Sequence, residues 1–499
     1  MVSSSKFVIL LNYFKHIQKN IIMETKNLEG TRIESDLIGA RELPNSALYG
    51  VQTLRGIENF PISKFHLSDY PRFIFGLAVT KMAAARANHA LGLLTDEQAK
   101  AIEQACQEIM DGQHHEHFPV DMIQGGAGTT TNMNANEVIA NRALEIMGHQ
   151  RGEYQYCSPN DHVNCSQSTN DAYPTAIHVG LYYKHLSFIP HLNELIASFR
   201  AKGKEFAHII KMGRTQLQDA VPMTLGQTFN GFASILQDEV KHLEEAAADF
   251  LVVNMGATAI GTGICAEPGY AEKCVEAMCD ITGFKFELSG DLVGATSDTS
   301  CMVGYSSALR RVAVKVNKIC NDLRLLGCGP RCGLTEFNLP AMQPGSSIMP
   351  GKVNPVIPEV MNQICYKVMG NDLCVTMAGD AAQMELNAME PVMAQCCFES
   401  VDLMIHGFDT LRLRCVDGIT ANEERCRNEV HNSIGVVTAL NPVIGYKNST
   451  KIAKEALETG RSVYDLVLEH GILTKEDLDT ILSPENMIHP VKLDIKPMK

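Results

Sequence analysis

Tryptophan is absent from this 499-residue sequence, and aromatic residues make up only 6% of it. Positive charge is also scarce, because 57 Asp and Glu outnumber 43 Lys and Arg and leave a formal net charge of −14. A chain this acidic is poorly suited to bind nucleic acid or an anionic membrane surface. We therefore expect neither nucleic acid nor a membrane as a partner.

Long apolar runs are missing as well. The run Phe7–Phe14 is too short to span a bilayer, and no small-residue cleavage site follows it. We interpret residues 1–30 as a disordered extension or a mis-assigned start, since a more typical sequence opens at Met23. The sixteen cysteines lack regular spacing, which predicts buried, reduced thiols in a cytoplasmic protein. Cys328 and Cys332, whose three-residue gap differs from a CxxC motif, are expected to be buried too.

Helical periodicity dominates the middle of the chain. Apolar residues recur every three or four positions from Leu225 to Phe250, and again from Tyr305 to Leu326. The segments 173–210, 358–386 and 391–416 are also long, helical in composition and poor in strand formers. Five helices of this length form a bundle whose apolar area exceeds what one copy buries, which predicts a homo-oligomer.

The expected fold class is mainly α, in three domains. Residues 31–165 are expected to form a mixed, mostly helical N-terminal domain, and residues 166–418 the central bundle of five long helices. From residue 419 the chain changes to short elements separated by turn residues, so that residues 419–499 are interpreted as a small C-terminal helical domain.

The segment 345–355 gathers chemistry that a surface linker does not need. It reads Gly-Ser-Ser-Ile-Met-Pro-Gly-Lys-Val-Asn-Pro, with two hydroxyls, one cation and one amide between glycines and prolines. The prolines prevent a regular helix, and backbone N–H groups left free by such a loop can point at an anion beside Lys352. We expect an ordered loop over a small anionic ligand.

Three other polar segments precede helical stretches: 124–137, 160–171 and 212–222. The first lacks the third glycine of a Rossmann fingerprint and the Gly-Lys-Ser/Thr of a P-loop. Hydroxyls and free N–H groups at helix N-termini favour carboxylates, although plain N-capping by threonine explains the first segment equally well. Together with 345–355, these segments are typical of one composite site.

A histidine-rich stretch, Asp111–His117, also raises the question of metal binding. Its histidines follow a helix-ending glycine, and no fixed ligand spacing recurs elsewhere in the chain. We interpret it as a solvated polar turn and predict no metal site.

The four polar segments, in this order and spacing, resemble the motifs of the fumarase/aspartase superfamily, and the similarity covers roughly residues 34–490. Three positions favour the aspartase branch over class II fumarases. Fumarase-like chains usually carry His where this chain has Gln216 and Ser158, and the Val-Ile-Pro-Glu that ends at Glu359 resembles aspartases. Position 216 is not an absolute marker, because some aspartases also have His there.

The resemblance implies reversible elimination of ammonia from L-aspartate to give fumarate, through an enediolate-like (aci-carboxylate) intermediate. It makes Ser346 the general base that removes a Cβ proton. It gives the remaining substrate-binding roles to the β-carboxylate donors Thr129, Ser168, Thr169 and Ser347, the α-carboxylate anchors Lys352 and Asn354, and the amino-group neighbours Asn170, Thr215 and Gln216. This chemistry requires no metal and no organic cofactor.

The family also packs its bundles as a homotetramer in which each active site draws loops from three subunits, and we carry that arrangement over as an expectation. Three alternatives remain open at this stage. These alternatives are a class II fumarase acting on L-malate, another succinyl lyase of the superfamily, and a non-catalytic helical assembly protein.

Overall fold

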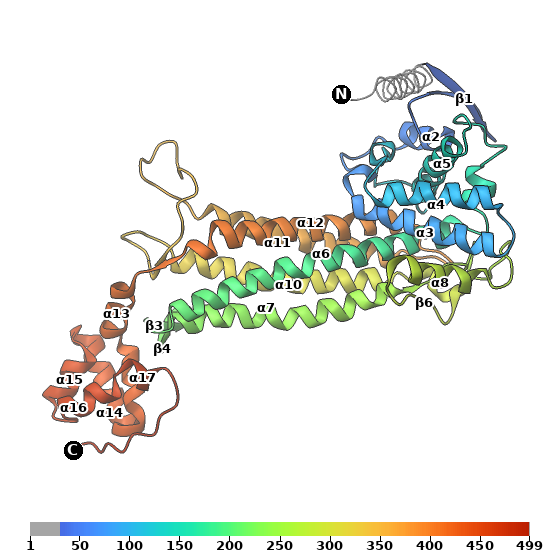
Figure 1. Ribbon diagram of the computed structural model, residues 1–499. Coiled ribbons are helices and arrows are strands. Elements are labelled where there is room, and N and C mark those ends of the chain that lie inside the picture. Colours follow the sequence, from blue (N-terminus) through green and yellow to red (C-terminus); the bar gives the residue numbers. More distant parts are fainter. Residues whose placement is uncertain (1–29, 499) are drawn as a thin grey trace, which may run out of the picture. The chain divides into compact units, whose positions relative to one another are not determined.

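The computed structural model describes residues 30–498 of the chain. The interpretation of residues 1–30 as an extension or mis-assigned start therefore falls almost wholly outside the described residues. Within them the protein is mainly helical (Figure 1). The five long helices predicted from periodicity are present, as α6 (Thr169–Glu205), α7 (Leu225–Ala248), α10 (Ser300–Leu326), α11 (Val356–Asp380) and α12 (Glu390–Arg414).

The chain divides into two compact units, and every boundary between them falls within one of the long helices. Of the described residues, unit 1 comprises 30–187, 243–309 and 370–401, and unit 2 comprises 188–242, 310–369 and 402–498. The division into domains at residues 165 and 418 stays a prediction.

Unit 1 begins with a two-stranded antiparallel sheet, β1 (Thr31–Asp36) and β2 (Gly39–Pro44), in which Thr31 pairs with Pro44. Its helices before α6 are α2 (Val51–Asn59), α3 (Pro71–Ala90), α4 (Asp96–Met110) and α5 (Thr129–Ile146). The buried carboxylate of Glu137 in α5 accepts hydrogen bonds from the N–H groups of Gly50, Gln52 and Thr53 at 2.8–3.0 Å. A side chain of one helix thereby caps the start of another, since first-turn N–H groups have no partner within their own helix.

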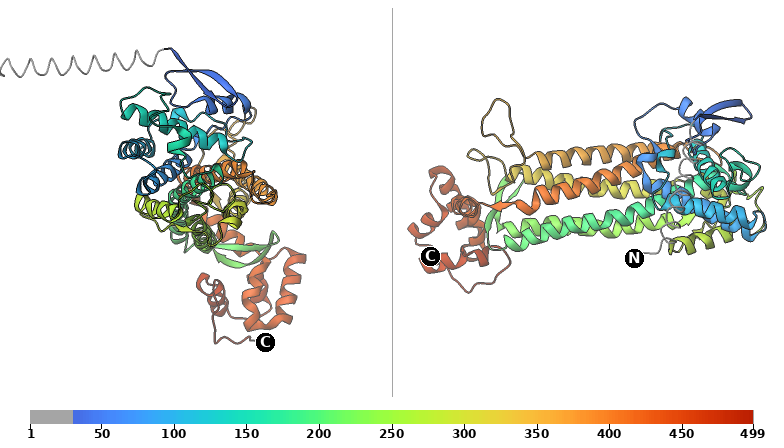
Figure 2. Two further views of the ribbon diagram at one scale, coloured as in Figure 1. Left: turned by 90° about the vertical axis from the view of Figure 1, so that its right-hand side faces the viewer. Right: turned by 45° about the horizontal axis from the view of Figure 1, so that its top comes forward.

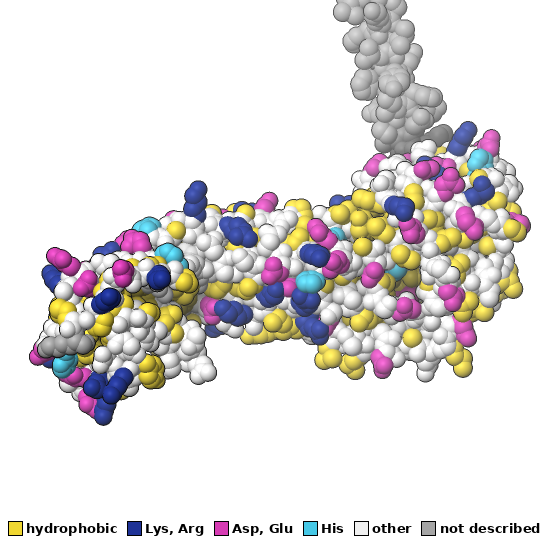
Figure 3. Space-filling view, turned by 90° about the horizontal axis from the view of Figure 1, so that it is seen from below, with side chains coloured by type: hydrophobic (Ala, Val, Ile, Leu, Met, Phe, Trp, Pro, Cys, Tyr) yellow, Lys and Arg dark blue, Asp and Glu magenta, His cyan; other side chains and the backbone are white. Residues whose placement is uncertain are grey.

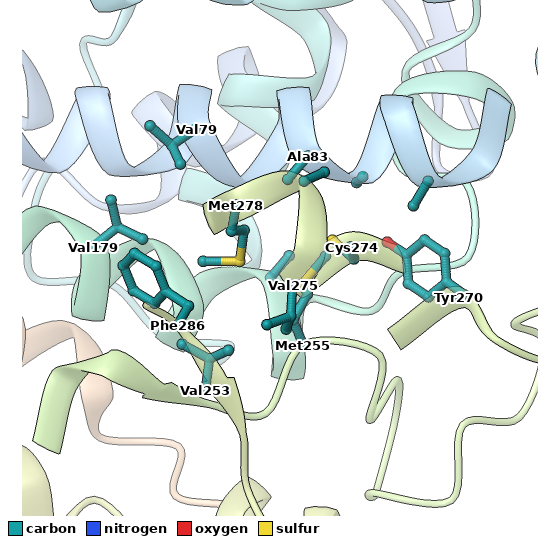
Figure 4. Close-up of a cluster of buried hydrophobic side chains, with 14 residues drawn as sticks. Val79, Ala83, Val179, Val253, Met255, Tyr270, Cys274, Val275, Met278 and Phe286 are labelled. Atoms are coloured by element: carbon teal, nitrogen blue, oxygen red, sulfur yellow. The ribbon is translucent and has the colours of Figure 1, made fainter. Parts of the chain in front are cut away.

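The core of unit 1 explains why α3 is so rich in alanine. Helix α3 is buried on nearly all sides, and small side chains let α8 (Tyr270–Thr282) approach it closely. Figure 4 shows Val79 and Ala83 of α3 beside Met278 of α8 and Phe286. Unit 1 also contains the short elements β5 (Val252–Val253), which pairs in parallel with β6 (Glu287–Leu288), and α9 (Leu292–Ser297).

In unit 2 the long helices are joined by ring contacts and ion pairs. Phe199 of α6 lies edge-on to Phe232 of α7, with ring centroids 5.8 Å apart. The buried Glu239 of α7 pairs with Arg311 of α10 at 3.0 Å. Asn362 of α11 donates a 2.6 Å hydrogen bond to an asparagine of α10. These contacts order the helices within unit 2.

One expected element has a different structure. Segment 212–222, predicted to be a loop before a helix, lies in an antiparallel hairpin of β3 (Ile210–Thr215) and β4 (Gln218–Thr224) that leads into α7 (green in Figure 2). The prediction missed the hairpin because its turn, Gln216-Leu217, contains no glycine or asparagine. Both residues nevertheless have positive φ, 54° and 64°.

The end of unit 2 is helical, as predicted for the C-terminal region, and its helices lie together in Figure 1. Leu440, Ile452, Leu466 and Leu478 are among the buried residues of its core. The elements of this part are α13 (Glu423–Asn432), α14 (Val437–Thr459), α15 (Val463–Glu469), α16 (Lys475–Ile481) and α17 (Pro484–Met487), preceded by β7 (Phe337–Asn338) paired with β8 (Thr420–Ala421).

The surface carries interspersed charges, with Lys and Arg beside Asp and Glu on the face drawn in Figure 3. Among the described residues, no helix is long and apolar enough to cross a membrane. All sixteen cysteines are free thiols, and most are buried as predicted. The expectation was wrong for Cys332, which is exposed, and for Cys328, which is half-buried, because both flank the solvent-facing turn 329–333.

The first residue of α12 gives unit 1 a pH-dependent stability. Glu390 is buried, and burial raises its pKa from the ordinary 4.5 to about 8. The unfolded chain releases this proton above pH 4.5, whereas the folded chain retains it up to about pH 8. The free energy of unfolding should therefore fall by a few kcal/mol across this window.

Glu390→Gln cannot ionise and should flatten this part of the profile, which urea unfolding at pH 5 and pH 8.5 measures. Glu276→Gln, at an exposed position of α8, controls for the loss of a carboxyl group. An unchanged slope in Glu390→Gln would show that Glu390 is not the titrating group.

Candidate active site

The loop 345–354 is ordered by hydrogen bonds to its own backbone. The Gly345 N–H donates to the Lys352 carbonyl at 2.7 Å, and the Asn354 side-chain amide donates to the Gly345 carbonyl, also at 2.7 Å. A Cβ on Gly345 would lie 2.6 Å from that Lys352 oxygen, so only glycine allows this closure. The amide of Asn354, predicted to anchor the α-carboxylate, thus also holds the loop together.

Ser346 lies inside this loop with its hydroxyl oxygen facing two donors. Its Oγ accepts hydrogen bonds from the N–H groups of Ile348 at 3.2 Å and Met349 at 3.1 Å. Two backbone dipoles aimed at one oxygen stabilise the negative charge that this oxygen acquires when its proton leaves. Sequence analysis proposed Ser346 and expected free N–H groups in this loop, but it did not show that two of them face the Ser346 oxygen, because backbone groups carry no residue-specific signal.

The rest of the loop faces outward. Ser347 and Lys352 are exposed, as are the apolar Ile348, at 82%, and Val353. An ammonium group in this position presents a point charge to an incoming anion. The exposed apolar side chains of an ordered loop indicate a surface that is covered when the site is complete.

The hairpin β3–β4 carries Thr215 and Gln216, both exposed at its tip. Thr215 pairs with Gln218 across a two-residue turn, and Gln216 and Leu217 both adopt left-handed backbone angles, which non-glycine residues adopt at a cost of roughly 1 kcal/mol each. The hairpin is anchored at Glu336, a fully buried carboxylate that forms an ion pair with the ammonium of Lys211 at 2.7 Å. The guanidinium of Arg214 also donates to it.

In unit 1, Thr129 is the first residue of α5. It follows Gly128, whose φ is 86°. A Cβ at this position would lie 2.5 Å from the Tyr173 ring, so only glycine fits. The Thr129 hydroxyl donates to the Gly126 carbonyl at 2.8 Å. Its donation to a substrate carboxylate therefore requires rotation about χ1 or exchange of this partner.

Ser168, Thr169 and Asn170 open α6. The Asn170 N–H donates to Ser168 Oγ at 3.2 Å, and the Asp171 carboxylate accepts from the Ser168 N–H at 2.9 Å, which is the reciprocal half of a capping box. The Asn170 side-chain amide donates to the Ala259 carbonyl at 2.8 Å. These contacts fix the backbone while the hydroxyls of Ser168 and Thr169 remain able to donate.

Asp171 ties this helix start to a distant segment. Its second carboxylate oxygen accepts the N–H groups of Gly256 and Thr258, both at 3.0 Å. The side chain is fully buried, and burial raises its pKa to about 6 against the opposing effect of these hydrogen bonds. Asp171 therefore has a structural role, because it caps the start of α6 and also binds the segment 256–258.

Behind these residues lies a buried polar network that sequence reasoning missed. Lys81 of α3 is fully buried, and its ammonium donates to Asn164 Oδ1 at 3.1 Å and to Gln167 Oε1 at 2.8 Å. Asn132 donates to the same Asn164 oxygen and to Thr169 Oγ1 at 3.2 Å. Burial lowers the pKa of Lys81 to about 7. The one lysine of an alanine-rich helix was the available signal.

The predicted site residues fall into two groups. Thr129, Ser168, Thr169 and Asn170 lie in unit 1, where Asn132 connects the first turn of α5 with the start of α6. The other six lie in unit 2, on the hairpin tip or in the loop: Thr215, Gln216, Ser346, Ser347, Lys352 and Asn354. Each group presents hydroxyls, amides or a cation, as a dicarboxylate requires.

Comparison with known families accounts for this combination of fold and residues. A model described as "Lyase" matches residues 39–370, and one described as "Fumarase C C-terminus" matches residues 436–489. The chain belongs to this family of fumarate lyases, as its four polar segments predicted.

Three similar proteins show which members of the family the chain resembles. The chain is 56% identical to an aspartate ammonia-lyase of Pseudomonas canavaninivorans, over 93% of this chain and 98% of that protein. It is 53% identical to the aspartate ammonia-lyase of Escherichia coli K12, over 92% and 96%. A crystal structure of class II fumarase from Schistosoma mansoni is 33% identical, with a TM-score of 0.87 over 92% of this chain and 99% of that one.

The fold is also that of "fumarate lyase:delta crystallin" from Brucella melitensis bound to cobalt. That crystal structure is 52% identical, with a TM-score of 0.90, and covers 92% of this chain and 100% of that one. Sequence identity is thus higher with the two aspartate ammonia-lyases than with the fumarase, in agreement with the branch that Gln216 and Ser158 favoured.

The anchor of the hairpin can be tested by stability. Glu336→Gln should lower the free energy of unfolding by about 3–5 kcal/mol, because it leaves the buried Lys211 ammonium without its carboxylate and leaves the half-buried Arg214 with Glu429 as its remaining close partner. Thermal unfolding measures the loss. Glu287→Gln removes a carboxylate from an exposed pair with Lys285 and should leave the melting temperature nearly unchanged. Equal melting temperatures for the two variants would rule out an anchoring role for Glu336.

Proposed function

We propose that this protein catalyses the reversible elimination of ammonia from L-aspartate to give fumarate. The 53–56% identity to aspartate ammonia-lyases over more than nine-tenths of the chain supports this reaction. The observation that carries the mechanism is the Ser346 hydroxyl with two backbone N–H groups directed at its oxygen.

The first chemical step removes a proton from Cβ, next to a carboxylate that is already charged. A serine hydroxyl is a very weak base unless its oxyanion is stabilised, and the N–H groups of Ile348 and Met349 supply that stabilisation to Ser346. As the proton leaves, negative charge spreads into the β-carboxylate to give an enediolate. Preorganised hydroxyl and N–H donors stabilise this intermediate more than the substrate, which lowers the barrier.

The β-carboxylate donors in this proposal are Thr129, Ser168, Thr169 and Ser347. The hydroxyl of Thr169 suits this role because its oxygen already accepts from Asn132, which leaves its proton for the substrate. The buried ammonium of Lys81, three hydrogen bonds away through Asn164 and Asn132, supports the same donor. Lys81 therefore acts as a positioning residue behind the site.

Lys352 and Asn354 bind the α-carboxylate, and Asn170, Thr215 and Gln216 surround the amino group. When the Cα–N bond breaks, its electron pair leaves with the nitrogen, so that the already protonated amino group of the substrate departs as ammonia. Exposed amide and hydroxyl groups at the hairpin tip are suited to hold this polar leaving group through hydrogen bonds. The amide of Gln216, in place of an imidazole, is the feature that we connect with an amino-acid substrate.

The active form in this proposal is a homotetramer in which loops from three subunits make each site. An unpartnered apolar face supports it, since Tyr366, Leu373 and Met377 share one side of α11 and the last two are 62% and 67% exposed. The exposed Ile348 of the catalytic loop fits the same arrangement. Free thiols throughout the chain support a reducing, cytoplasmic location.

The reaction is tested by the near-ultraviolet absorbance of fumarate when the full-length protein meets L-aspartate, with L-malate in a parallel cuvette. We expect fumarate from L-aspartate alone. Fumarate from L-malate alone would make the protein a fumarase with an altered pocket. Absence of fumarate from both would exclude both reactions and favour a bulkier succinyl substrate or a structural role.

Ser346→Ala tests the base. It should reduce kcat by about 10²–10⁴-fold, because it removes the group that accepts the Cβ proton. Size-exclusion chromatography should show an unchanged assembly, since a single hydroxyl is lost from a surface loop. Ser300→Ala, outside every predicted site segment, provides the matched control. Full activity in Ser346→Ala would assign the base to another residue.

A further inference from the structure

The short turn after α4 holds a cluster of side chains that the proposed reaction does not use. His114, Glu116 and His117 lie in and next to the single helical turn η2 (His115–His117), and each offers one ligand atom within 4.8 Å of the other two. We propose that this turn binds one divalent transition-metal ion, such as Co²⁺ or Zn²⁺, through two imidazole nitrogens and a carboxylate oxygen. Imidazole and carboxylate ligands suit these ions.

The backbone of the turn creates the cluster. His114 has a left-handed φ of 66°, and the 3₁₀ turn that follows places residues three apart on one side. The sequence-based interpretation as a solvated turn does not describe the histidines, whose side chains are only 21% and 18% exposed. Glu116 is 72% exposed, so the histidines form the more buried side of the cluster and the carboxylate faces solvent.

His114 has the second partner that metal-binding histidines usually have. Its Nε2 lies 3.1 Å from a carboxylate oxygen of Glu108 in α4. Glu108 is held by Arg142 of α5 through bonds of 2.6 and 3.1 Å. A carboxylate beside one imidazole nitrogen holds a proton there and leaves the lone pair of the other nitrogen for a metal ion.

His117 is half-buried and lies beside Glu116. Its Nε2 lies 3.6 Å from a carboxylate oxygen of Glu116, and its Nδ1 is 3.5 Å from the Leu48 N–H, at the outer limit of a hydrogen bond. The rings of His117 and His114 lie 6.4 Å apart, inclined by 27°.

An ion in this cluster would draw the three ligand atoms closer, because metal–ligand bonds of about 2.0–2.2 Å place neighbouring ligands roughly 3–4 Å apart. The exposed Glu116 side chain is free to make that movement. Water would occupy the remaining positions. Through His114 and Glu108 the ion would tie the turn to α4, so its role is to stabilise unit 1 rather than to take part in the elimination.

The test is a titration of the full-length, chelator-stripped protein with Co²⁺, followed by its d–d absorbance, and with Zn²⁺ in competition with a chromophoric chelator. We expect one tight equivalent per chain and a higher melting temperature with Zn²⁺, because the ion binds the folded form. His114→Ala and His117→Ala should each weaken binding at least about 10-fold, and Glu108→Gln by about 10–100-fold through loss of the second partner.

His115→Ala is the matched control, since its Nε2 bonds to the Ile109 carbonyl at 2.9 Å and is not a ligand in this proposal. It should retain the tight equivalent. Circular dichroism and fumarate production report on whether each variant folds. The proposal is overturned if the native protein takes up no saturable equivalent, or if folded His114→Ala and His117→Ala bind Co²⁺ as well as the native protein. Equal weakening in His115→Ala would also overturn it.

Discussion

This structure depends on providing acceptors for backbone N–H groups that have no partner within a helix. At three places an oxygen atom or carboxylate collects several of them: Glu137 at the start of α2, Asp171 at the start of α6, and Ser346 in the catalytic loop. At the first two, carboxylates meet the donors and hold distant segments together. At Ser346 the donors face a neutral hydroxyl, so these hydrogen bonds become strongest when that oxygen becomes negatively charged.

Hydrogen-bond donors are also paired with acceptors in the surroundings of the site. Asparagine, glutamine and lysine side chains fill the space behind Ser168 and Thr169, and each amide is oriented by its neighbours. A buried ammonium such as that of Lys81 is unfavourable without oxygen partners, and Asn164 and Gln167 provide them. The hydroxyls of Ser168 and Thr169 therefore rest on a framework in which the ammonium of Lys81 and the amide nitrogens of Asn132 and Asn164 have acceptors.

Membership of the fumarate lyases places this chain among enzymes that remove a proton beside a carboxylate, and relatives in this family differ in the leaving group. In the proposed mechanism, the loop 345–354 and the hydroxyls serve the step that aspartate and malate would share. Selectivity must come from the residues near the leaving group, and Gln216 stands at the tip of a strained hairpin that Arg214 and Glu336 hold in place. Strain kept by a buried ion cluster is typical of functional positions.

The sequence by itself determined the long helices and the family. Periodicity over many turns is a strong signal, so the five long helices were predicted within a few residues at most ends. Ordered motifs likewise predicted the family, and they make Ser346 and Lys352 the proposed site residues. Where local signals were weak, prediction failed: Gln216-Leu217 lacks the usual turn residues, and the hairpin was missed.

Only the tertiary structure decided which groups surround these residues. The N–H groups on Ser346, the lysine behind Thr169 and the pairing of His114 with Glu108 all depend on atoms brought together by packing or by backbone angles. Their partners are backbone atoms, or side chains that are distant in the chain or in a different helix. The physical reason is that residue type and spacing encode propensity and polarity, whereas hydrogen bonds and burial depend on distances that exist only after the chain has folded.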